Sequence, residues 1–203
     1  QHEVIAYSLH VKGFTRQSAS GVRHKGTFAG LVEKIPYLTG LGINQIHCMP
    51  VYEFEECQTY RNYWGYGEGF YFAPKSAYSS NGVNYWGYGP GYFFAPKSSY
   101  AAGEHPVTEL KDMIKACHKA GIEVILEMPF DASAGRQLME ECLRYYRMEY
   151  HVDGFIVNPV FFSAEEIAKD PILSRTKILI HSNDYQNIMR RFLKGDEGMV
   201  EAV

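Results

Sequence analysis

Short apolar runs rich in β-forming residues alternate with helical patterns along nearly the whole chain, and this alternation constrains the fold more than any other feature. The runs that predict strands are residues 4–11 (VIAYSLHV), 43–50 (INQIHCMP), 123–130 (EVILEMPF), 152–158 and 177–181 (KILIH). Strands that alternate with helices are joined in parallel by right-handed crossovers. The sequence therefore predicts an α/β fold. Periodicity alone leaves open both a doubly wound sheet and a β/α barrel, which five strands would leave unclosed.

Helix signals fill the segments between these runs. Residues 27–42 and 106–121 each begin at a capping residue or a proline and end at glycine, and residues 136–150 carry a third pattern. A capping box, Ser163 with Glu166, predicts a short fourth helix. The positions expected to face the core are Leu31, Ile35, Leu38, Leu41, Val107, Leu110, Ile114, Cys117, Leu138, Cys142 and Tyr145.

Composition and charge narrow the class of protein. With 203 residues, 46% of them apolar, the chain can bury one full-sized core, so residues 1–203 are expected to form a single domain. A net charge of -3, with acids and bases mixed along the length, indicates no nucleic-acid partner. No apolar run approaches the roughly 20 residues that span a bilayer, and no signal peptide is evident, so we expect a cytoplasmic protein without a membrane partner.

Cysteines and histidines give no sign of a cofactor or a metal. The four cysteines lack zinc-type spacing and are interpreted as reduced, packed thiols. Five of the eight histidines likewise show no metal spacing, so structural roles are expected for each of these five. These residues are Cys48, Cys57, Cys117, Cys142, His10, His47, His118, His151 and His181.

One stretch breaks the alternation. Residues 62–80 (NYWGYGEGFYFAPKSAYSS) return almost unchanged as residues 84–102 (NYWGYGPGYFFAPKSSYAA). Two copies inside one strand-to-helix connection indicate a local tandem duplication. We expect the second copy to occupy the position that the fold provides, because it leads directly into the helix near Val107, and the first copy to form an added loop or hairpin.

Aromatic rings beside glycines make this repeat the candidate binding element. Trp64 and Tyr66 in the first copy, and Trp86 and Tyr88 in the second, can provide a flat platform on which a sugar ring stacks. The alternative is that these rings fill the space beneath a loop.

The acidic residues are poorly placed for glycosidic chemistry, which usually needs two carboxyl groups at strand ends. Glu127 lies in the middle of a predicted strand, and Asp153 lies at the start of one, on the face that serves stability in a barrel. Glu53, Glu55 and Glu56 follow the second strand, where a run of acids is expected to form a solvated loop.

Seven blocks of the chain resemble the α-amylase superfamily, glycoside hydrolase family 13, and its isoamylase, pullulanase and glycogen-debranching branch most closely. They are residues 10–15 (HVKGFT), 25–38 (KGTFAGLVEKIPYL), 41–54 (LGINQIHCMPVYEF), 84–101 (NYWGYGPGYFFAPKSSYA), 109–125 (ELKDMIKACHKAGIEVI), 149–155 (EYHVDGF) and 189–199 (MRRFLKGDEGM). The resemblance implies a partial (β/α)8 TIM barrel, with roughly its first five β/α units and a following helix.

The same resemblance implies that the catalytic positions are degenerate. The Asn-His pair that follows the third strand in active members falls on Asp131 and Ala132. The arginine and the nucleophilic aspartate of the fourth strand fall on Ile156 and Asn158. The general acid and base of the fifth strand falls on His181, and the seventh-strand aspartate would lie beyond the last residue.

What the resemblance implies about function follows from these replacements. An amide cannot form the glycosyl intermediate, so we expect a catalytically inactive relative of the debranching enzymes. It would retain binding of α-glucan, such as glycogen, starch or maltooligosaccharide, on Tyr88, Trp86 or their duplicates, and could self-associate. The alternatives are an active debranching hydrolase acting on α-1,6 linkages and a structural remnant without function.

Overall fold

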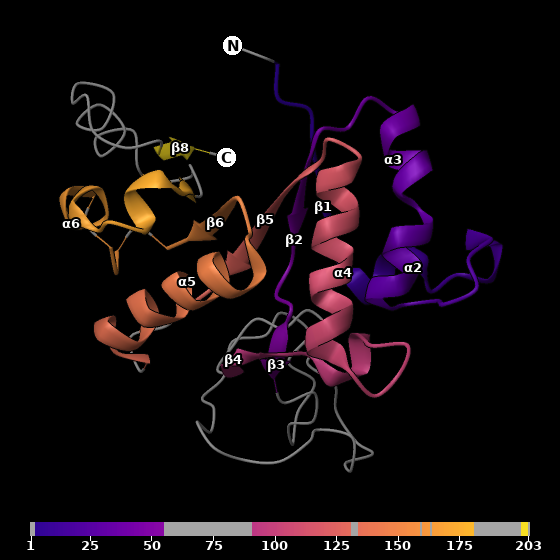
Figure 1. The fold of residues 1–203 in the computed structure, drawn as a ribbon, viewed down its shortest axis with the longest axis horizontal. Helices are drawn as coiled ribbons and strands as arrows, with labels where there is room; N and C mark the ends of the chain where they lie inside the picture. Colours follow the sequence, from indigo (N-terminus) through magenta and orange to yellow (C-terminus); the bar gives the residue numbers. More distant parts are fainter. Residues whose placement is uncertain are drawn as a thin grey trace.

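A parallel six-stranded sheet forms the centre of the molecule (Figure 1). The computed structural model describes residues 3–54, 91–130, 134–158, 160–162, 164–180 and 200–202. The strands of the sheet, in spatial order, are β1 (Ala6–Leu9), β2 (Gln45–Cys48), β5 (Glu123–Met128), β6 (Gly154–Val157), β7 (Lys177–Ile180) and β8 (Val200–Ala202).

The predicted strand order is confirmed. The five predicted runs contain β1, β2, β5, β6 and β7, and each pairs in parallel with the next. The short strand β8 adds a sixth member that the sequence did not predict. The described strands form an open sheet with β1 and β8 at its edges, so the structure has the α/β architecture of part of a barrel without closing it.

Helices cover one face of this sheet. They are α1 (Val11–Thr15), α2 (Phe28–Glu33), α3 (Ile35–Gly40), α4 (Pro106–Lys119), α5 (Arg136–Tyr150) and α6 (Ala164–Lys169), with short 3₁₀ turns η1 (Ser18–Ser20), η3 (Ser98–Tyr100) and η5 (Leu173–Arg175). One set of alternating strand residues, which includes Ile46, Leu126 and Phe155, joins helix residues in the main core. The opposite face carries a separate small cluster of Ile125, Ile156 and Leu179.

Two details of the helices differ from the prediction. The pattern over residues 27–42 forms two helices instead of one. Thr27 caps the first, accepting a hydrogen bond from the Gly30 N–H at 3.1 Å, but Pro36 has no N–H to continue it and lies in the first turn of the second. Leu41 and Val107, predicted to be buried, are 50% and 40% exposed, because each lies at a helix end: Leu41 follows the last turn of α3, and Val107 is in the first turn of α4.

The other core predictions stand. Leu31, Leu38, Leu110, Ile114, Cys117 and Cys142 are buried. Ile35, Leu138 and Tyr145 are partly buried against the same core. Cys48, Cys117 and Cys142 are unpaired and buried, and burial raises the pKa of the Cys117 thiol to about 12, so these thiols pack as neutral groups. Cys57 lies outside the described residues.

An antiparallel pair of strands that the sequence did not predict, called the hairpin below for its pairing alone, lies beyond the carboxyl end of β2. Its strands are β3 (Tyr52–Phe54) and β4 (Gly91–Pro96), and Glu53 is in register with Tyr92. The strand β4 belongs to the second copy of the repeat, so this part of residues 84–102 pairs directly with the segment that follows β2. The first copy, residues 62–80, lies outside the described residues.

Within the described parts of the chain, no helix is both long enough and apolar enough to cross a membrane.

Candidate functional site

The carboxyl ends of the strands are where a parallel β/α fold places its chemistry. Three described features reach this edge: the β3–β4 hairpin after β2, the end of β5, and Asn158 directly after β6. Glu127 near the end of β5 is in register with Ile156 on β6, which in turn is in register with Leu179 on β7. These positions therefore form one layer across the sheet, on the face opposite the helices.

Ile156 makes this layer apolar at its centre. Its side chain is 4% exposed and packs with Ile125 and Leu179. The resemblance to glycoside hydrolase family 13 implies an arginine at this position in active members. In its place the structure has an aliphatic side chain that can neither carry charge nor donate a hydrogen bond.

Asn158 has a local structural role at the same edge. Its side-chain Oδ1 accepts a hydrogen bond from the Val160 N–H at 3.1 Å, and its carbonyl accepts one from the Phe161 N–H at 3.2 Å. These bonds form a turn stabilised by the asparagine side chain. The exposed amide is thus positioned by its own loop, and its oxygen is neutral at every pH at which the fold exists.

Glu53 corrects the expectation of a solvated acidic loop. Its carboxylate is buried: Oε1 accepts a hydrogen bond from Lys97 Nζ at 2.9 Å, and Oε2 accepts one from the Ser98 N–H at 2.7 Å. Burial alone would raise the pKa of Glu53, but the Lys97 ammonium and the Ser98 N–H outweigh it and hold this pKa below its usual value. Glu55 and Glu56 lie outside the described residues.

Lys97 is the other half of this buried pair. Its side chain is fully buried, donates to the Phe54 carbonyl at 3.1 Å, and lies 3.9 Å from the centroid of the Phe54 ring. The ammonium is therefore held by a carboxylate, a carbonyl and an aromatic face together. Sequence patterns missed this pair because a lysine after Ala-Pro has no local sign of burial.

His10 and Tyr100 lie beside the hairpin and share a buried hydrogen bond of 2.8 Å between Nε2 and the hydroxyl. His10 Nδ1 accepts from the Gly13 N–H at 2.9 Å and thereby caps α1. Because Nδ1 is an acceptor, the imidazole is neutral and Nε2–H donates to Tyr100. The structural role expected for this histidine is confirmed.

Three more of the five histidines named above are described, and they differ among themselves. His47 Nε2 lies 2.7 Å from Gln45 Oε1, and His118 Nε2 lies 2.8 Å from Asp153 Oδ2, which also accepts from the Val124 N–H. These two therefore have the expected structural partners, and Asp153 has the stabilising role expected for it. His151 is exposed and ends α5 as its left-handed C-cap, and its imidazole forms no hydrogen bond with the described residues.

Several predicted site residues are not described by the structure. Those outside the described ranges are Asp131, Ala132, His181, Trp64, Tyr66, Trp86 and Tyr88. The described part of the candidate site therefore consists of Ile156 and Asn158, with Glu127 beside them. The Glu53–Lys97 pair of the hairpin lies at the same edge of the sheet.

Comparison with known proteins defines the class first. No family model matches the chain. The fold matches the crystal structure of a pullulanase from Paenibacillus barengoltzii in complex with maltohexaose and α-cyclodextrin, with a TM-score of 0.63 and 21% identity over 88% of this chain and 35% of that one. The fold therefore matches part of the fold of that structure.

Sequence similarity narrows the class. The chain is 28% identical to isoamylase 1 of Oryza sativa subsp. japonica over 76% of its length, and 30% identical to a GlgX homolog of Haemophilus influenzae over 75% of its length. The resemblance to the isoamylase and pullulanase branch of glycoside hydrolase family 13 is thus confirmed. The chain spans only 23% and 28% of these two relatives.

Proposed function

We propose that this chain is a catalytically inactive relative of the debranching enzymes that binds α-glucan. The proposal rests on Ile156 and Asn158 at the end of β6, which the family resemblance matches to the arginine and the aspartate of active members. Ile156 is enclosed in an apolar cluster, and the amide of Asn158 is held by its own turn.

The chemistry of these two residues supports inactivity. A retaining glycosidase needs an anionic oxygen that attacks the sugar and a carboxyl group that protonates the leaving group. Asn158 supplies a neutral oxygen, and no charge stands at Ile156 to orient a nucleophile. Loss of one member of such a unit often lowers the rate by about 10⁴ to 10⁶, so replacement of two is expected to abolish turnover.

Support for glucan binding comes from the relatives. The pullulanase that shares this fold was crystallised with maltohexaose, and a relative of the same fold class with maltotetraose. In this chain the proposed contacts are Trp86 and Tyr88 of the second repeat copy. Residues 91–102 of that copy lead from the hairpin to α4, which favours the second copy as the one in the family position.

The repeat offers a matched control for the test. Binding of maltohexaose is measured by calorimetry for the full chain, for Trp86→Ala with Tyr88→Ala, and for Trp64→Ala with Tyr66→Ala. The proposal expects millimolar affinity that the first double variant loses and the second retains. The reverse pattern would assign the first copy to the site. If neither the full chain nor the variants bind maltohexaose, the binding proposal fails and the alternative of a structural remnant without function is favoured.

Hydrolysis is tested separately. Release of reducing ends from pullulan and glycogen is followed after removal of contaminating amylase. The proposal expects no turnover above background, whereas cleavage of α-1,6 linkages would establish an active debranching enzyme and refute it.

We also propose a reducing compartment, the cytoplasm, as the location. Three buried thiols without disulfide partners among the described residues support this proposal. Oxidised, disulfide-linked protein recovered from cells would contradict it.

A further inference from the structure

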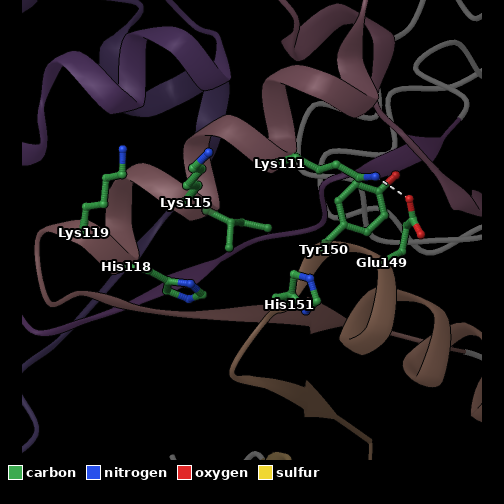
Figure 2. Close-up of a pocket in the computed structure, with 8 residues that line it drawn as sticks. Lys111, Lys115, His118, Lys119, Glu149, Tyr150 and His151 are labelled. Atoms are coloured by element: carbon green, nitrogen blue, oxygen red, sulfur yellow. Dashed lines mark hydrogen bonds and ion pairs between the residues drawn. The ribbon is translucent and has the colours of Figure 1, made fainter.

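A groove lies between α4 and the end of α5, on the side of the sheet that the helices cover (Figure 2). Its volume is about 560 Å³, in the range of pockets that hold small molecules. Both helices end here and lead into β5 and β6, so the groove lies toward the amino ends of these strands. It is therefore separate from the candidate site around Asn158, and the inference drawn from it does not depend on the proposed function.

Cationic side chains dominate this groove. Lys111, Lys115 and Lys119 follow one another at intervals of four residues and so emerge in a row from α4. Lys111 forms an ion pair with Glu149. Lys115 and Lys119 are exposed and make no ion pair with any described residue, which leaves two uncompensated charges in the groove.

The two histidines in the lining, His118 and His151, add to the basic character of the groove. His118 pairs with Asp153. The Asp153 carboxylate also accepts a hydrogen bond from the Val124 N–H, so it is already engaged twice. His151 lies toward His118 in Figure 2, and its imidazole has no hydrogen-bond partner among the described residues. Glu149, the one acid in the lining, and Asp153 are thus both paired, while the lining contains three lysines.

Stabilisation of a helix end does not explain the whole row. Cations in the last turn of a helix interact favourably with its dipole, and Lys119 and His118 lie in that turn. Lys111 and Lys115 lie further back, where this effect has faded. Like charges four residues apart destabilise a helix by about 0.2 to 0.5 kcal/mol per pair, so the row favours an external anion.

The backbone conformation of His151 also supports an anion site in this groove. It adopts a left-handed conformation, φ 58° and ψ 34°, and no other non-glycine residue of the described chain has a positive φ. Gly42 and Gly121, which follow α3 and α4, also have a positive φ. A histidine in place of the usual glycine costs stability, and what it adds here is an imidazole in the groove.

We propose that this groove binds a phosphate dianion, either free or as the monoester of a small organic molecule. Lys115, Lys119 and His151 would donate to the phosphate oxygens, and such charge-assisted bonds are the strong ones. The groove is larger than phosphate alone, and Ile114 and Tyr150 line it with apolar surface against which an organic group can pack.

The test measures binding of inorganic phosphate, glucose 6-phosphate and glucose to the full chain by calorimetry at low ionic strength, where a Debye length of about 30 Å preserves the attraction. Millimolar binding of both phosphates, and none of glucose, is expected. Tighter binding of the sugar phosphate identifies a monoester site, and equal binding identifies a site for free phosphate. Absence of phosphate binding overturns the proposal.

Three variants assign the binding to the groove. Lys115→Gln with Lys119→Gln should weaken phosphate binding about tenfold. Glu149→Gln should tighten it two- to fivefold, roughly the effect expected when an ion pair of this kind is released, because Lys111 then becomes available. The matched control, Arg16→Gln with Lys25→Gln, removes the same charge from exposed positions outside the lining and should change affinity less than twofold.

The side chains replaced in these variants are exposed or partly exposed, so each variant is expected to fold, and circular dichroism checks this. An equal loss in the control pair would indicate a general effect of net charge and overturn the assignment, as would an unchanged affinity in Glu149→Gln.

Discussion

Removal of the Lys97 side chain is the sharpest test of how the hairpin is held. In Lys97→Ala the Glu53 carboxylate stays buried without the ammonium that lies 2.9 Å away, and the Phe54 ring and carbonyl lose their cation. Loss of one partner of a buried pair typically costs about 3 to 5 kcal/mol. Since total stabilities are about 5 to 15 kcal/mol, this is a large fraction.

The measurement is urea unfolding followed by circular dichroism, supported by thermal unfolding. For a chain of this size, a loss of that magnitude corresponds to a drop in Tm of roughly 6 to 20 °C. The control is Lys25→Ala, an exposed lysine whose loss should change stability by less than about 0.5 kcal/mol. A cost below about 1 kcal/mol for Lys97→Ala would show that the pair behaves like a surface ion pair and would refute the reasoning.

A double variant separates the pair from its packing. In Glu53→Gln with Lys97→Met both charges are removed together, and pairs replaced by neutral groups are often tolerated. We expect the double variant to lose less stability than the sum of the single variants, by about 0.5 to 3 kcal/mol. Strict additivity would mean that the two side chains do not interact.

The same pair predicts a pH dependence. The pKa of Glu53 is lower in the folded chain than in the unfolded one, so its contribution is present above the ordinary carboxyl pKa and is lost as the pH falls through the lowered value. Lys97→Ala removes the cation that lowers this pKa, so the acid loss of stability should be smaller in the variant than in the natural chain.

Other predictions follow from the site, the repeat and the sheet edge. Asn158→Asp, alone or with Ile156→Arg, should not restore hydrolysis of pullulan above background, because the other catalytic positions remain altered; measurable turnover would contradict this. Deletion of residues 62–83 should leave the unfolding midpoint unchanged or raised, whereas a severe loss would show that the first repeat copy belongs to the core. The edge strand β1 pairs only with β2 among the described strands, and Ile5 just before it is 42% exposed, so Ile5→Lys should reduce self-association in sedimentation; a natural chain that is strictly monomeric would contradict the prediction.

Local patterns in the sequence predicted the order of the fold. Alternating strand and helix signals can be satisfied by consecutive parallel strands, and β1, β2, β5, β6 and β7 pair in that order. The resemblance of residues 149–155 to family 13 also led to the prediction that Ile156 and Asn158 replace two catalytic residues, because residue types at matched positions can be compared without coordinates. These inferences depend on neighbours along the chain.

The features that the sequence did not predict depend on residues that are neighbours in space but distant along the chain. Glu53 and Lys97 are 44 residues apart, and only the antiparallel pairing of β3 with β4 brings them together. A run of glutamates after a strand therefore predicted a solvated loop, whereas one of them is buried against a lysine. Periodicity likewise cannot tell that Leu41 and Val107 lie at helix ends that leave the core.

In the groove between α4 and α5, too, the sequence shows some features and only the tertiary structure decides others. The spacing of Lys111, Lys115 and Lys119 is visible in the sequence, but a row of lysines on a helix usually faces solvent. That the row borders a groove together with His151, in a conformation usually taken by glycine, was decided by the packing of two helices on a sheet. Charge and periodicity are properties of the chain, whereas burial and the pairing of charges arise only when distant segments meet.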